Sequence, residues 1–201
     1  MVGKGEEWRA GYTYWMWLKQ ERFLHCVTVL TLSFILLIVW LVSAGYFDPK
    51  PVGSLRWQKS LPPQTVVAGP AQIMWLEVVK TADYSVRTTV MYQSGEKDII
   101  YGLALGSESD YLVVAVSPLG YVSLWQGGTV IMPLQTWPHV HMDSAPNEIW
   151  VNVEQAQLTV HLNREILWTG DSSVGSGIGV MGQSWGETGV IHIPSVQLFT
   201  P

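Results

Sequence analysis

Hydrophobic and polar positions follow three patterns along the chain. From Cys26 to Phe47 no charged residue occurs, and a helix of that length covers the roughly 30 Å hydrocarbon core of a bilayer. Because backbone polar groups in lipid must be hydrogen-bonded internally, this run predicts one transmembrane helix over residues 23–47. An aromatic-rich tail, residues 1–22, precedes the helix. Residues 48–70 are rich in proline and predict an extended linker.

The remainder, residues 71–201, consists of short apolar runs separated by turn residues. Several runs alternate with period two, so that Ile149, Val151 and Val153 share one face of a strand. About nine to eleven such runs, with almost no helical periodicity, predict an all-β domain built as an antiparallel two-sheet jelly-roll sandwich. The runs are QIMWLEVV, YSVRTTVMY, DIIYGLALG, DYLVVAVS, GYVSLW, TVIMPL, NEIWVNVE, QLTVHL, EILW, GIGVMG and GVIHIPSVQLF.

The apolar run has two interpretations. A small-residue VSA sequence before Gly45 fits a cleaved signal peptide, whereas the long segment ahead of the run favours an uncleaved signal-anchor. Lys19 and Arg22 lie nearest the helix, so the positive-inside rule predicts a cytoplasmic N-terminus. We therefore expect a single-pass protein of the cell membrane whose C-terminal domain is periplasmic or extracellular. Cys26 is the one cysteine, so that domain contains no disulfide.

The tail contains more aromatic rings than a membrane-interface belt requires. At about 100° per residue the rings would cover several faces of a helix. This arrangement predicts that the tail contacts other membrane-protein subunits, or a pigment or lipid bound to them, as well as the lipid bilayer. The predicted partner and membrane-interface residues are Trp8, Tyr12, Tyr14, Trp15, Trp17, Trp40 and Tyr46.

Candidate metal and pigment ligands are few, and no cofactor is predicted. His25, at the membrane edge, could ligate a chlorophyll-type pigment or a haem, although an interfacial histidine bonded to headgroups or water is the alternative. In PHVH, His139 and His141 would lie on one side of a strand, a spacing that suits Zn²⁺ or Cu²⁺; two exposed histidines in a loop are the alternative. Glu108 and Asp110 could help to hold Ca²⁺, but a solvated turn is the better interpretation.

The sequence contains one possible catalytic motif, but the segments around it do not fit the structure that the motif requires. GQSWG matches G-x-S-x-G around Ser184, but a nucleophile elbow requires a helix after the serine. The sequence that follows, GETGVIHIP, predicts a turn and a strand. The paired carboxylates of a glycosidase are also not apparent. We therefore predict that the protein is not an enzyme.

Two stretches resemble a known family of jelly rolls. YGLALGSESDYLVVAVSPLGYVSLW and NEIWVNVEQAQLTVHLNREIL are similar to strand patterns of laminin-G-like, concanavalin A-like domains, and the resemblance extends from about Ala71 to Phe199. Asn163-Arg164 stands where the family usually has Asn-Gly, so this hairpin departs from the usual type I′ sequence. The resemblance implies a jelly roll that serves as a sugar-binding, adhesion or protein-interaction module, often on bacterial surfaces.

Charge narrows the partner classes. The net charge is −5, and acidic residues outnumber basic ones after Gly45, so a polyanion is repelled and nucleic acid is excluded. The sequence predicts a non-catalytic accessory subunit of a bacterial membrane complex, respiratory or photosynthetic. The alternative is a membrane-anchored carbohydrate-binding module that uses exposed rings such as Trp125, Trp137 or Trp185; an anchored hydrolase is weaker.

Overall fold

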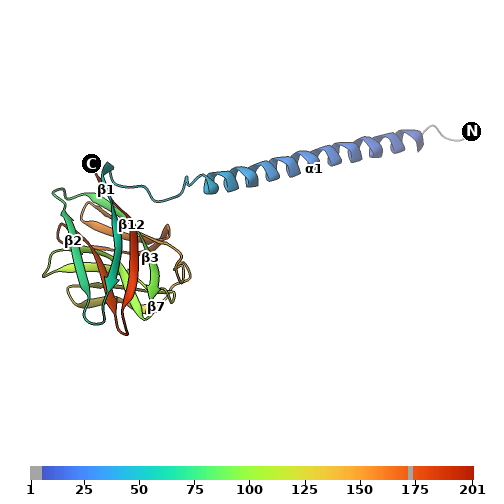
Figure 1. Ribbon diagram of the computed structural model, residues 1–201. Coiled ribbons are helices and arrows are strands. Elements are labelled where there is room, and N and C mark those ends of the chain that lie inside the picture. Colours follow the sequence, from blue (N-terminus) through green and yellow to red (C-terminus); the bar gives the residue numbers. More distant parts are fainter. Residues whose placement is uncertain (1–5, 172–173) are drawn as a thin grey trace, which may run out of the picture. The chain divides into compact units, whose positions relative to one another are not determined.

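The chain separates into two compact units. A computed structural model describes residues 6–171 and 174–201, with side chains from residue 23 onward. The units are Met1–Pro49 and Lys50–Pro201, and the first contains the helix α1 (Glu6–Ser43; Figure 1). Within α1, Phe23–Ser43 has a mean hydropathy of 2.6 and is long and apolar enough to cross a membrane. Such a helix serves as a membrane anchor or as a signal sequence.

The aromatic-tail prediction depends on side chains that the structure does not describe. Trp8, Tyr12, Tyr14, Trp15 and Trp17 lie in this part of the chain, and their contacts stay predictions.

The described part of α1 carries the other predicted membrane residues. His25 and Cys26 are exposed on α1, as is Trp40. Tyr46 is exposed just beyond the helix, with its ring against the edge of Phe47. Their roles at a membrane interface, and that of His25 as a ligand, stay predictions.

The second unit is a sandwich of two six-stranded antiparallel sheets, which confirms the predicted all-β class. Figure 1 shows β1, β12 and β3 side by side in one of them. Sheet A contains, in spatial order, β1 (Ser54–Val66), β12 (Gly189–Thr200), β3 (Tyr84–Gly95), β8 (Asn147–Glu154), β9 (Gln157–Leu162) and β10 (Glu165–Asp171). Sheet B contains β2 (Gln72–Val78), β11 (Gly177–Ser184), β4 (Ile99–Gly106), β5 (Tyr111–Val116), β6 (Tyr121–Gln126) and β7 (Thr129–Thr136).

The prediction of a linker over residues 48–70 is wrong for most of this range, because the strand β1 lies within it. β1 is an edge strand that pairs with β12 alone. Its register shifts between Lys59 and Leu61 and again between Leu61 and Gln64. Pro62 and Pro63 therefore fall outside the paired positions. An edge strand with such irregularities tolerates prolines, which cannot donate to the ladder. The prolines are also what concealed the strand in the sequence.

One apolar core lies between the sheets. Alternate residues of facing strands are fully buried in it, among them Leu103 and Val114 of sheet B and Val160 of sheet A. The predicted inward face of β8 is confirmed, since Ile149, Val151 and Val153 belong to this core. The pattern of period two therefore places the intervening side chains on the outer faces of the two sheets.

Two hairpin turns hold non-glycine residues in the left-handed region at both central positions. Gln155 and Ala156, between β8 and β9, have φ of 51° and 62°, and Asn163 and Arg164, between β9 and β10, have φ of 51° and 75°. Positive φ at both positions is the type I′ geometry. The β9–β10 turn thus keeps the usual geometry even though its sequence departs from Asn-Gly.

The two ends of the sandwich are named by the point of chain entry. The proximal end is where the chain enters through Lys50, and there β1 begins while β2 and β12 end. At the distal end β8 begins, β9 ends, and the loop from β7 to β8 crosses between the sheets.

Replacement of Ala156 by glycine should stabilise the sandwich. A left-handed conformation costs a non-glycine residue about 1–2 kcal/mol, and glycine avoids this cost. We expect the free energy of unfolding of Ala156→Gly, measured by denaturant titration in detergent, to rise by up to about 1 kcal/mol. Ala115→Gly, at a fully buried strand position, is the control and should lower it. A lower stability for Ala156→Gly would contradict the prediction.

Candidate functional site

A polar cavity lies on sheet A at the distal end of the sandwich. Its volume is about 350 Å³, which falls in the range of small-molecule sites, about 300–1,000 Å³. Four elements supply its walls: the strands β3 and β8, the β7–β8 loop and the β9–β10 turn. The lining residues are Thr89, His141, Pro146, Glu148, Asn163 and Arg164.

Two asparagines hold the cavity walls together. Asn147 is fully buried; its Oδ1 accepts from the backbone N–H of His141 at 2.8 Å, and its Nδ2 donates to the carbonyl of His141 at 2.8 Å. Asn163 donates to Asn147 Oδ1 at 2.8 Å and to the carbonyl of His139 at 2.5 Å. Its Oδ1 accepts from the backbone N–H of Glu148 at 2.7 Å. The β7–β8 loop is therefore fixed to both neighbouring strands.

A further contact, with the backbone of Pro146, determines the tautomer of His141. Its Nδ1 lies 2.8 Å from the carbonyl oxygen of Pro146. Because a carbonyl can only accept, Nδ1 carries the proton and donates it. The Nε2 atom of the neutral ring is then a hydrogen-bond acceptor, and His141 is one of the exposed residues that line the cavity.

A charged and aromatic row borders the cavity on the outer face of sheet A. Arg87, Trp150 and His161 are cross-strand neighbours. Arg87 forms an ion pair with Glu148 Oε2 and stacks over the Trp150 ring at 5.1 Å. Trp150 also stacks on Phe199, at 6.5 Å between ring centroids. Arg87 thus has a fixed position between a carboxylate and an indole.

This row contains polar atoms without partners. The Oε1 atom of Glu148, the Nε1 atom of Trp150 and the Nδ1 atom of His161 are buried and have no hydrogen-bond partner among the described residues. A buried polar atom without a hydrogen bond lowers the stability of the folded protein unless water or a ligand bonds to it. Burial lowers the pKa of His161, and a hydrogen bond with the backbone of Trp150 opposes this shift.

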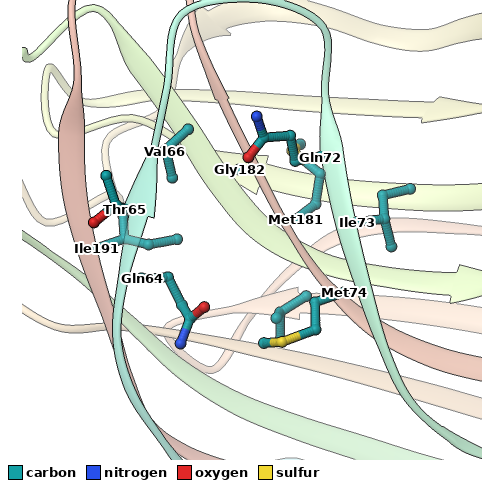
Figure 2. Close-up of a pocket in the computed structure, with 10 residues that line it drawn as sticks. Gln64, Thr65, Val66, Gln72, Ile73, Met74, Met181, Gly182 and Ile191 are labelled. Atoms are coloured by element: carbon teal, nitrogen blue, oxygen red, sulfur yellow. The ribbon is translucent and has the colours of Figure 1, made fainter.

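A second, smaller cleft opens between the edge strands of the two sheets. Figure 2 shows Gln64 and Thr65 of β1 on one side and Ile73 of β2 on the other, with Met181 of β11 between them. Its volume is about 120 Å³. Val66 closes it closely enough that a Cβ on Gly182 would lie 2.5 Å from a Val66 methyl group. With its small size and uncharged lining, this cleft offers fewer fixed partners to a polar ligand than the cavity on sheet A.

The outer face of sheet B is apolar. Small residues of its central strands, such as Ala104 and Ala115, are fully buried there beneath larger side chains. The Trp75 ring lies on β11, where a Cβ on Gly179 would be 3.0 Å from the indole, and it meets the edge of Tyr111 at 6.4 Å between centroids. Trp125 belongs to the same cluster. We name Trp75, Tyr111 and Trp125 the aromatic layer.

The three tryptophans predicted as stacking platforms have separate positions. Trp125 lies in the aromatic layer, while Trp137 is partly buried and packs against the main core. Trp185 is half exposed in the β11–β12 loop. The structure therefore does not bring them together.

The predicted metal pair lies in a loop. His139 and His141 are exposed in the β7–β8 segment, which agrees with the loop interpretation and not with a placement on one side of a strand. His139 lies near Trp137, at 6.2 Å between ring centroids, while His141 lines the cavity. Within residues 23–171 and 174–201, no group of three or more His, Cys, Asp or Glu residues is close enough to hold a metal ion.

Ser184 has a structural role at the end of β11. It is fully buried, and its Oγ donates to the carbonyl of Glu187 at 2.5 Å. The loop after it leads to β12, as the sequence predicts, so the strand–serine–helix geometry of a nucleophile elbow does not form here.

Sequence reasoning missed most of the cavity. Thr89, Glu148 and Arg164 were not singled out, because each is an ordinary polar residue at a strand or turn position. The sequence features that could have indicated the cavity are the polar residues at the first position of β8 and at the β9–β10 turn. Only the pairing of β3, β8 and β9 shows that they converge.

Comparison with known proteins supports the fold class. No family model and no curated protein matches the sequence. The Bacteroides ovatus protein described as xyloglucan PUL GH43B is 9% identical, with a TM-score of 0.53 over 69% of this chain and 32% of its own. This chain thus spans about a third of that protein. The carbohydrate-binding module CBM66 from Bacillus subtilis gives a TM-score of 0.45 at 9% identity, covering 73% of this chain and 89% of its own. Sheep galectin-11 gives 0.46 at 16%, covering 70% and 100%.

The sheet topology defines the class of the sandwich unit. It is a two-sheet antiparallel β-sandwich with jelly-roll-like neighbours. The narrower resemblance to laminin-G-like domains stays a prediction.

The buried histidine of sheet A should make stability depend on pH. The pKa of His161 lies below its usual value of 6.5, so the unfolded chain takes up a proton more readily than the folded one. Stability is therefore full above pH 6.5 and falls as the pH drops towards the folded pKa. We expect the unfolding midpoint of the parent to fall more between about pH 7.5 and pH 5.5 than that of His161→Gln. His25→Gln, outside the sandwich, is the control; equal pH slopes in all three proteins would refute the assignment.

Proposed function

We propose that the protein is a membrane-anchored carbohydrate-binding module whose site is the polar cavity on sheet A. The observation that carries the proposal is the set of fixed polar groups in one cavity. Thr89 supplies a hydroxyl, His141 Nε2 is an acceptor, and Glu148 brings a carboxylate to the same wall. A sugar presents many hydroxyls, each a donor and an acceptor, and such a ligand complements these groups.

The charges of the cavity favour a neutral ligand. Glu148 is compensated by Arg87, and Arg164 contributes a further cation to the same wall. A strongly basic ligand would bring a further positive charge beside Arg164, and that repulsion costs binding free energy. An uncharged polyol avoids that cost while still using the hydrogen-bonding groups.

Rigidity also supports binding. The asparagine network ties His141 and Glu148 to the same framework, so little loop ordering is required when a ligand enters. Preorganised walls raise affinity because the entropic cost has already been met during folding.

A second candidate function is the accessory subunit that the sequence predicted. The aromatic layer on sheet B favours it, since an apolar sheet face with partly exposed rings suits contact with another protein. The tail residues on which that prediction chiefly depended lie outside the described side chains. The polar cavity provides the more specific chemistry, and carbohydrate binding is therefore the preferred function.

Sugar binding can be tested with the full chain in nanodiscs. Neutral oligosaccharides, with xyloglucan fragments among the first because of the Bacteroides neighbour, would be titrated calorimetrically. Thr89→Val removes one hydroxyl without changing the shape of the side chain, and we expect it to weaken binding about five- to tenfold, the value of one hydrogen bond. Arg164→Ala should weaken binding by at least as much.

A matched control separates the cavity from an aromatic platform. Trp185→Ala removes a half-exposed ring outside the cavity and should leave sugar affinity unchanged. If Trp75→Ala or Trp125→Ala abolishes binding while Thr89→Val has no effect, the site lies on sheet B. Failure of every neutral oligosaccharide to bind the parent would refute the carbohydrate function itself.

The membrane anchor has an independent test. Protease added to the exported face of sealed vesicles should remove the sandwich, because its loops lie on that side, and should spare the N-terminal tail. Immunoblotting with tags at both ends of the chain measures this. Protection of the C-terminal tag in intact vesicles would show the reverse topology, and recovery of a chain that begins near Gly45 would show a cleaved signal peptide.

A further inference from the structure

The basic residues of the sandwich are unevenly distributed. At the proximal end, Arg56 and Lys80 line one cavity of about 200 Å³ together with Thr81, Thr200 and the carboxylate of Glu77. Lys59, on the same strand as Arg56, is also exposed and lies 3.6 Å from Glu77. We name Arg56, Lys59 and Lys80 the basic corner; it lies where β1 begins and β2 ends.

Two of these cations form no salt bridge with any residue that the structure describes. Arg56 and Lys80 are exposed and form no ion pair within the described parts of the chain, whereas Lys59 is partly compensated by Glu77. The corner thus carries net positive charge on a unit in which acidic residues otherwise predominate. Exposed cations beside threonine hydroxyls form a suitable environment for a phosphate group.

Apolar side chains flank the same cations. Leu55 is 51% exposed beside Arg56, and Val78 is 61% exposed in the wall of the cavity. Cations combined with exposed apolar side chains are typical of surfaces that lie at a membrane interface, where the charges meet headgroups and the apolar groups reach the acyl boundary.

The chain keeps this corner within reach of a bilayer. The apolar part of α1 ends at Ser43, and β1 begins at Ser54. The segment between them spans at most about 40 Å when fully extended. With α1 inserted, the corner therefore meets headgroups at high local concentration, while the acidic remainder of the sandwich is repelled by an anionic surface.

We propose that the basic corner binds the phosphate groups of anionic lipid headgroups and so orients the sandwich on the membrane. Each cation near an anionic surface contributes about a fivefold gain in binding. The bound state presents the proximal end to the lipid and leaves the distal cavity, at the opposite end of the same unit, open to solvent.

The test compares two lipid compositions with the full chain. Nanodiscs of phosphatidylcholine alone and of phosphatidylcholine mixed with phosphatidylglycerol would be analysed by hydrogen exchange of backbone amides. We expect slower exchange in residues 54–59 and 76–81 in the anionic discs alone, and loss of this protection at high salt, because the interaction is screened. Equal exchange in both lipids would overturn the proposal.

Charge variants locate the contact. Lys80→Gln should lower the ratio of bound to free sandwich about fivefold, and Arg56→Gln together with Lys80→Gln about thirtyfold. Lys97→Gln, which removes one charge at the distal end, is the matched control and should leave the protection unchanged. If Lys97→Gln has the same effect as Lys80→Gln, the effect is one of net charge and the corner is not the site.

A final arm separates lipid from soluble phosphate. Inorganic phosphate would be added to the phosphatidylcholine discs. We expect no protection there, because the corner requires several headgroups and a fixed surface. Protection by inorganic phosphate alone would identify a soluble anion as the ligand and overturn the lipid assignment.

Discussion

Burial of alternating side chains between the two sheets is the interaction on which the rest of the sandwich depends. A slip of one residue in any strand would move residues such as Leu103 or Val160 from the core to the outer face of the sheet, so the core fixes the register of every pair. Once the register is fixed, the cross-strand neighbours of the outward-facing residues are fixed as well. Arg87 then lies opposite Trp150, and Trp150 opposite His161, because their inward neighbours are packed.

The distal end depends on a different constraint, which is the satisfaction of buried polar groups. The β7–β8 loop has no strand ladder of its own. Some of its backbone groups bond to other backbone groups, and those of His139 and His141 bond to the side chains of Asn147 and Asn163. A buried amide has to be fully paired to be tolerated, and a fully paired network is rigid. An irregular loop can therefore form a fixed wall of a cavity.

The surfaces of this one fold differ in chemistry. The outer face of sheet A carries charged and polar side chains around an indole, while that of sheet B carries the aromatic layer above alanine and glycine. The basic corner lies at the end where the chain enters, opposite to the polar cavity. Because the core uses only the inward positions, the outward positions of each sheet are free to differ, and a single small domain can present several kinds of surface.

Local patterns in the sequence determined the apolar helix, the all-β class and eleven of the twelve strands, because an uncharged run and a period of two are properties of neighbouring residues. β1 was missed, since Pro62 and Pro63 conceal a strand whose irregular edge pairing tolerates them. The cavity was decided by tertiary structure alone. Thr89, His141 and Glu148 are ordinary in their own segments, and they meet only because strand pairing between distant parts of the chain sets them side by side. Such pairing depends on the register of a core built from the whole domain, which no local pattern encodes.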